Sequence, residues 1–139
     1  MASLQHQWLL LWVARKMTAD GFLLTAYEGP TPQGGVWNNL PRPPTIEGVR
    51  PDAAALETGS GLAAVGEAKS YTDVDTFHTR AQLGVFGNLD CGNARRCRLY
   101  VAVPRSAANL LDRVLVDLGL IGARHLTRLH IPDVLLGAR

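Results

Sequence analysis

The sequence predicts an α/β domain built around a mixed β-sheet, and three observations carry this prediction. Apolar segments follow one another in the order helix, strand, two strands joined by a tight turn, helix, strand, helix, strand. The turn at 58–61 is short enough to make the strands at 49–57 and 62–69 an antiparallel hairpin. The strand at 97–103 follows strand 62–69 through a helix, so a right-handed crossover places these two strands parallel.

Composition indicates one ordinary globular domain over residues 1–139, with 47% hydrophobic and 19% charged residues. The net charge of +2 is compatible with nucleic-acid binding but does not argue for it. The longest apolar stretch, 8–14, is far shorter than the roughly 20 residues that cross a bilayer, so we expect no contact with a membrane. Arg15 and Lys16 follow this stretch where a signal peptide would have small residues, so we expect a cytoplasmic protein.

The first half of the chain is expected to contain a helix at 3–19, capped by Ser3, and a strand at 22–28. The helix is apolar around most of its circumference, which predicts that the rest of the domain or a partner subunit of a homodimer covers it. A long loop rich in proline and glycine follows at 29–48. Trp37 and Arg42 within this loop either contact a substrate or hold the loop on the surface.

The second half is expected to contain a helix at 76–89 capped by Asp75, and a strand at 97–103 stopped by Pro104. A third helix begins after Ser106 as its cap and ends at Gly119, with its apolar residues in one stripe. The segment 125–136 adds a final strand. The expected sheet is therefore covered on both faces, as a three-layer sandwich with an additional helix and strand near the end of the chain.

Two cysteines, Cys91 and Cys97, flank a short segment that contains glycine and arginine. We expect reduced thiols close to a loop. The alternatives are a hairpin disulfide and half of a metal site, although the absence of a nearby histidine makes a zinc site a weak interpretation.

The strand at 62–69 ends in Glu67-Ala68-Lys69, which places an acid and a base on one face of the strand and Ala68 on the other. Asp52, in the preceding strand of the hairpin, is expected to face them. Charged groups among small apolar neighbours are costly unless they are paired or bind a metal. Two carboxylates and an ammonium suit a hard divalent cation and a phosphate substrate. The alternative interpretation is a structural salt bridge near a strand end.

Pro51-Asp52, followed after fourteen residues by Glu67-Ala68-Lys69, resembles the signature of the PD-(D/E)XK nuclease superfamily. The order of elements from Ser3 to Val103 is also similar to the α-β-β-β-α-β core of its restriction-endonuclease-like fold, so the resemblance covers about three quarters of the chain. No P-loop, GxGxxG, GxSxG or HExxH motif supports another class of enzyme.

The resemblance implies metal-dependent hydrolysis of nucleic acid by a DNA endonuclease or nuclease subunit. Asp52, Glu67 and the backbone carbonyl of Ala68 would hold Mg²⁺, or Mn²⁺ in its place, and Lys69 would orient the attacking water and steady the phosphate. Gln82 matches a family position on the helix that follows the motif. Arg80 on that helix, and Arg50, are candidate phosphate contacts. For Gln82 and Arg80 the alternative is a solvated helix face.

The sequence departs from the family pattern in its first helix, because residues 3–19 contain no glutamate that could add a metal ligand. Gln5, His6 or Glu47 could take that place. The resemblance therefore favours a one-metal site over a two-metal site. It also leaves an alternative function open, that of a catalytically silent nucleic-acid-binding or assembly module on the same fold.

Overall fold

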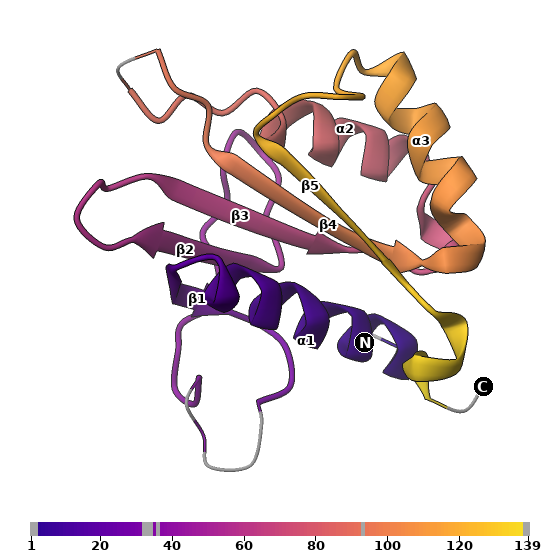
Figure 1. Ribbon diagram of the computed structural model, residues 1–139, viewed down its shortest axis with the longest axis horizontal. Helices are drawn as coiled ribbons and strands as arrows, with labels where there is room; N and C mark the ends of the chain where they lie inside the picture. Colours follow the sequence, from indigo (N-terminus) through magenta and orange to yellow (C-terminus); the bar gives the residue numbers. More distant parts are fainter. Residues whose placement is uncertain (1–2, 32–34, 36, 93, 138–139) are drawn as a thin grey trace.

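A computed structural model describes residues 3–31, 35, 37–92 and 94–137 and contains one five-stranded sheet. Figure 1 shows the strands side by side in chain order, and their bounds are β1 Phe22–Tyr27, β2 Ala53–Glu57, β3 Ala63–Ala68, β4 Arg98–Pro104 and β5 Leu126–Ile131. The β1–β2 and β2–β3 pairs are antiparallel, whereas β3–β4 and β4–β5 are parallel. The predicted hairpin, the predicted parallel crossover and the mixed sheet are all confirmed.

Helices cover both faces of the sheet, with α1 (Leu4–Ala19) on one face and α2 (Phe77–Phe86) and α3 (Ala108–Asp117) on the other (Figure 1). Two separate hydrophobic cores result, one under α1 and one under α2 and α3. Most of the apolar surface of α1 is buried in its own domain, which explains why the helix is apolar on so many sides. No helix in the described ranges has the length and hydropathy needed to cross a bilayer.

Two predicted helix caps are wrong, because the side chains of Asp75 and Ser106 bond to other side chains and not to the backbone of the first helical turn. Thr76 caps α2, since its hydroxyl accepts a hydrogen bond from Thr79 N, while Asp75 pairs with Arg80 instead. Ser106 lies in a 3-10 turn, Arg105–Ala107, that precedes α3. Its hydroxyl donates to an Asp133 carboxylate oxygen at 2.6 Å, a contact between segments distant in sequence.

Prolines shorten two of the predicted strands. The expected strand 49–57 begins only at Ala53, since Pro51 has no N–H to give to a ladder. Asp52 therefore lies directly before β2, and its backbone N–H still donates to Gly66 O. The expected strand 125–136 ends at Ile131, before Pro132, and continues as a 3-10 turn over Asp133–Leu136.

The loop at 29–48 is held against the domain by two contacts of the residues singled out within it. Trp37 packs edge-to-face on Tyr27, with ring centroids 5.4 Å apart. Arg42 pairs with Glu28 at 2.6 Å. Both contacts favour the interpretation that these side chains fix the loop on the surface. Residues 32–34 and 36 lie outside the described residues.

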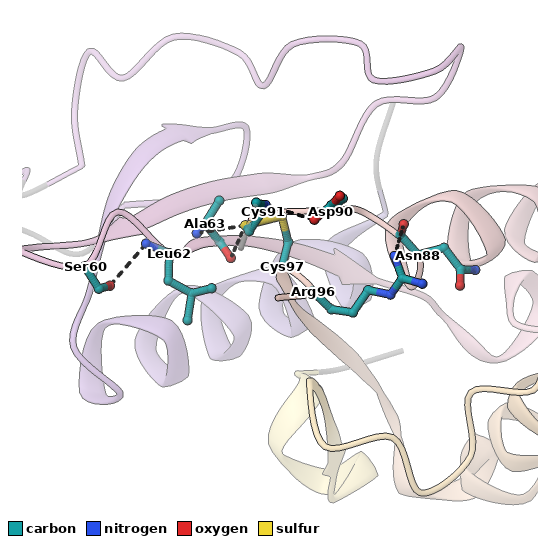
Figure 2. Close-up of a disulfide and its surroundings, with 9 residues drawn as sticks. Ser60, Leu62, Ala63, Asn88, Asp90, Cys91, Arg96 and Cys97 are labelled. Atoms are coloured by element: carbon teal, nitrogen blue, oxygen red, sulfur yellow. Dashed lines mark hydrogen bonds between the residues drawn. A yellow bond between two sulfur atoms is a disulfide. The ribbon is translucent and has the colours of Figure 1, made fainter. Parts of the chain in front are cut away.

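The prediction of reduced thiols is wrong, because Cys91 and Cys97 form a disulfide (Figure 2). The bond closes a loop between α2 and β4, in which Cys91 N donates to Arg95 O at 2.8 Å. The sulfur of Cys91 also accepts a hydrogen bond from Ala63 N at 3.3 Å, which docks the loop on the start of β3. Spacing alone left this pairing as one of three alternatives; the turn that brings the two Cα atoms within 5.2 Å decides between them.

Gly66 lets α1 lie close to β3, so a side chain there is expected to destabilise the protein. A Cβ at Gly66 would overlap Val13 Cγ1 and sit 3.2 Å from Met17 Sδ. We expect Gly66→Ala to lower the free energy of unfolding by about 1–3 kcal/mol through overpacking. Gly84→Ala in α2 is the matched control, since its Cβ meets only Leu118 Cδ2 at 3.9 Å and alanine favours a helix. Urea unfolding of both variants measures the effect, and equal stabilities would contradict it.

Candidate functional site

The structure brings together all four residues that the sequence predicted as catalytic. Asp52 immediately precedes β2, Glu67 lies near the end of β3, Lys69 follows β3, and Gln82 comes from α2. Ala53 pairs with Gly66, so continuing this register by one residue sets Asp52 opposite Glu67. Glu67 and Lys69 share the face that Val65 turns toward α2, as the period of a strand requires. We refer to these four residues as the acid–lysine cluster.

Lys69 is the centre of the acid–lysine cluster. Its ammonium donates a hydrogen bond to Gln82 Oε1 and lies 3.4 Å from Glu67 Oε1. The side chain is 11% exposed, so these contacts are shielded from water. An ammonium has three N–H donors, so the hydrogen bond to Gln82 and the ion pair with Glu67 leave at least one for a further acceptor. Because Gln82 is buried and bonded to Lys69, the alternative that Gln82 belongs to a solvated helix face is wrong.

Glu67 has no solvent exposure, and one of its two carboxylate oxygens accepts a hydrogen bond. Its Oε2 accepts a hydrogen bond from Asp52 N at 2.8 Å. Its Oε1 faces Lys69 but has no hydrogen bond among the described residues. Burial raises the pKa of Glu67 well above its ordinary value, and repulsion by Asp52 raises it further, while Lys69 opposes both effects. Such an environment is typical of functional carboxylates.

Asp52 connects the buried acid to the surface, since its side chain is 22% exposed. Its Oδ2 accepts a hydrogen bond from Ala68 N at 2.9 Å and lies 3.3 Å from His6 Nε2. Its Oδ1 makes no hydrogen bond within the described part of the chain. The cluster is therefore open to solvent at Asp52 and closed at Glu67.

His6, in the first turn of α1, is the residue that reaches the site from the first helix. Sequence reasoning named it among three replacements for the missing glutamate, and the structure brings it to Asp52. Its other ring nitrogen, Nδ1, is buried and has no partner among the described residues. Glu47, by contrast, is exposed and makes no bond to the acid–lysine cluster within those residues.

The donor set fits a hard cation with few protein ligands. Within the described ranges no three His, Cys, Asp or Glu side chains are grouped closely enough to hold a metal ion. Mg²⁺, however, is commonly bound by one or two carboxylates with water and backbone oxygen completing its shell. Glu67 Oε1, a buried carboxylate oxygen without a hydrogen bond, and Oδ1 of Asp52 are the atoms left for such a ligand.

The two arginines predicted to contact phosphate lie in ion pairs outside the acid–lysine cluster. Arg80 contacts Asp75 and Asp117, both at 2.9 Å. Arg50 lies 4.0 Å from Glu28. Neither arginine side chain bonds to the four clustered residues. A role in phosphate binding therefore stays a prediction, and it requires both arginines to leave their present ion pairs.

Comparison with known proteins suggests no function for this chain, so a function has to be inferred from the geometry of the acid–lysine cluster. No protein-family model, no curated protein and no solved structure matches this chain.

Proposed function

We propose that this protein hydrolyses phosphodiester bonds of nucleic acid with the help of Mg²⁺ or Mn²⁺, and that it is a DNA endonuclease or nuclease subunit of the restriction-endonuclease-like fold. One observation carries the proposal: Asp52, Glu67, Lys69 and Gln82, from three separate elements, meet at one end of the sheet. The order and pairing of α1, β1–β4 and α2 support the same fold.

Each residue of the acid–lysine cluster has a role in this proposal. Asp52, Glu67 and the Ala68 carbonyl would hold the cation, which supplies a ligand water of lowered pKa and offsets charge on the phosphate. Lys69 uses its remaining N–H to stabilise the charge that develops on the phosphate oxygens. Gln82 positions Lys69 by accepting one of its hydrogen bonds. His6 orients Asp52 through its contact at 3.3 Å.

The second candidate function is a catalytically silent module on the same fold that binds nucleic acid or assembles with a partner. The absence of exposure at Glu67 favours it, because a cation and its water must reach this carboxylate before hydrolysis can occur. A homodimer through α1 and a cytoplasmic location remain predictions. Leu4 and Trp8 of that helix are exposed and could form part of such an interface.

Asp52→Asn tests the proposal at the exposed acid. We expect the wild-type protein to nick or linearise supercoiled plasmid with Mg²⁺ or Mn²⁺ but not with EDTA, and the variant to be at least about 100-fold slower. The substitution keeps the side-chain volume while it removes the charge. Agarose-gel electrophoresis measures both rates. If neither plasmid, single-stranded DNA, branched DNA nor RNA is cleaved with either metal, the silent module replaces the enzyme.

A further inference from the structure

Four arginines surround a groove at the other end of the sheet, and we refer to it as the arginine groove. It has a volume of about 550 Å³ and is lined by Arg95, Arg96, Arg98 and Arg124 together with Leu62, Ala94 and His125. All four arginines are exposed. They come from the loop before β4, from the start of β4 and from the segment before β5, so the groove exists only in the folded chain.

The positive charge of the arginine groove is not neutralised within the described residues. Elsewhere on the molecule, ion pairs to carboxylates engage Lys16, Arg42, Arg50, Lys69, Arg80 and Arg128. The groove arginines make no such pair with any residue that the structure describes. Arg96 and Arg98 instead donate to the backbone carbonyls of Asn88 and Arg124, at 3.2 and 3.4 Å, which orients their guanidinium groups (Figure 2 shows Arg96).

No acid is among the described residues that line the arginine groove, and the two acids of the adjoining hollow make bonds of their own. An adjoining hollow of about 280 Å³ shares Arg95 and Arg98 with the groove and adds Asp20 and Glu57. Asp20 accepts a hydrogen bond from Tyr100 at 2.8 Å and pairs with Lys16 at 3.1 Å. Glu57 accepts one from Ser60 at 2.6 Å. The bond to a neutral hydroxyl leaves the charge of Glu57 in place, but four arginines outnumber the acids beside them, so the surface is positive in sum.

The disulfide gives the arginine groove a fixed shape. Arg95 and Arg96 lie inside the loop that Cys91–Cys97 closes, and Arg98 follows it directly. The loop is anchored on β3 through Ala63 N and on the segment after α2 through the Cys97 N–H to Leu89 O bond at 3.0 Å. His125 Nε2 donates to Gly87 O at 2.7 Å and ties the opposite wall to the end of α2. Arginines on an anchored loop lose little conformational freedom when they bind a ligand.

We propose that the arginine groove binds the phosphodiester backbone of nucleic acid, independently of the acid–lysine cluster. Guanidinium groups bind phosphate oxygens in bidentate fashion, and four of them across one groove suit a ligand that carries several phosphates in a row. The groove offers no exposed large apolar side chain for a lipid surface or a hydrophobic peptide to contact. Its described lining contains one aromatic ring, that of His125, which is tied to Gly87 O. We therefore expect the arginines to bind the charge of the backbone and to contribute little to sequence specificity.

The arginine groove and the acid–lysine cluster lie at opposite ends of β3, because Leu62 directly precedes this strand and Lys69 directly follows it. Leu62 lines the groove and Lys69 belongs to the cluster, and seven residues of extended chain span about 23 Å. Duplex DNA carries one negative charge about every 1.7 Å of its axis, so one molecule of modest length reaches both places. The choice of nucleic acid as the polyanion rests in part on the proposed function, whereas the binding itself is measured without metal.

The double variant Arg95→Ala/Arg124→Ala tests the arginine groove. Fluorescence anisotropy of a labelled 20-base-pair duplex in EDTA gives the dissociation constant between 50 and 300 mM salt. We expect Kd at 0.1 M salt to rise about tenfold or more, and the slope of log K against log salt to become shallower by about 2. The matched control is Arg105→Ala/Arg113→Ala, which removes two exposed arginines that also lack a carboxylate partner among the described residues but lie outside the groove.

An equal loss of DNA affinity in both double variants, or no loss of affinity in either, would overturn the proposal. The same titrations with single-stranded DNA and with RNA identify which nucleic acid supplies the phosphates. Vesicles that contain phosphatidylserine are titrated in the same way. If the groove variant binds these vesicles more weakly than wild type but binds every nucleic acid equally well, the surface is a membrane-binding one and the proposal is wrong. Groove-dependent binding without any cleavage would retain this proposal and refute the proposed function. Metal-dependent cleavage by the wild-type protein, with the same DNA affinity in the groove variant as in wild type, would do the reverse.

Discussion

Lys69→Met is expected to slow metal-dependent DNA cleavage by about 10²–10³-fold, the usual effect of removing one donor that stabilises transition-state charge. Methionine keeps most of the length and apolar stem of lysine but has no N–H. The ammonium lies between Gln82 Oε1 and Glu67 Oε1, so nothing else in the acid–lysine cluster replaces its positive charge. Initial rates of plasmid nicking measure the loss, and circular dichroism with DNA-binding anisotropy verifies that the fold and affinity are unchanged.

Lys16→Met is the matched control, since Lys16 is the other lysine of the sequence. It pairs with Asp20 one helical turn away in α1 and lies outside the acid–lysine cluster. We expect this variant to cleave at the wild-type rate. If both lysine variants are slowed equally, or if Lys69→Met cleaves normally, the role assigned to Lys69 is wrong.

Glu67→Gln is expected to abolish cleavage and also to change how stability depends on pH. The folded state disfavours ionised Glu67, because burial and Asp52 raise its pKa above the ordinary value of 4.5. As pH rises above about 4.5, the unfolded chain loses this proton first, so the wild-type free energy of unfolding falls. Glutamine cannot ionise, and the stability of the variant relative to wild type should therefore increase with pH.

Urea unfolding of both proteins between pH 4 and 8, in EDTA, measures this difference. Glu47→Gln is the control, because it removes the same charge from an exposed residue without a bond to the acid–lysine cluster in the described residues. It should retain both cleavage and the wild-type pH dependence. A Glu67→Gln variant that loses stability relative to wild type as pH rises would contradict the assigned environment of Glu67.

Much of the fold could be predicted because its signals are local. Apolar periodicity located three helices and five strands, and the short turn after β2 fixed the antiparallel hairpin. Element ends were less accurate wherever a partner distant in sequence competed for a local bond. Asp133, for example, draws Ser106 away from the cap of α3. Within the candidate site, the alternation of side chains along β3 was enough to place Glu67 and Lys69 on one face.

The sequence by itself determined the order of elements, the hairpin, and the spacing of Asp52, Glu67 and Lys69, since each depends on residues close together along the chain or on one turn. Only the tertiary structure decided that His6 contacts Asp52 across 46 positions, that Gln82 is buried against Lys69, and that the cysteines are bonded. It alone also assembled the arginine groove from three separate segments. The contacts of His6, of Gln82 and of the groove arginines depend on how segments distant in sequence pack together. The bond between the cysteines depends on the shape of the turn that joins them, which their spacing did not decide.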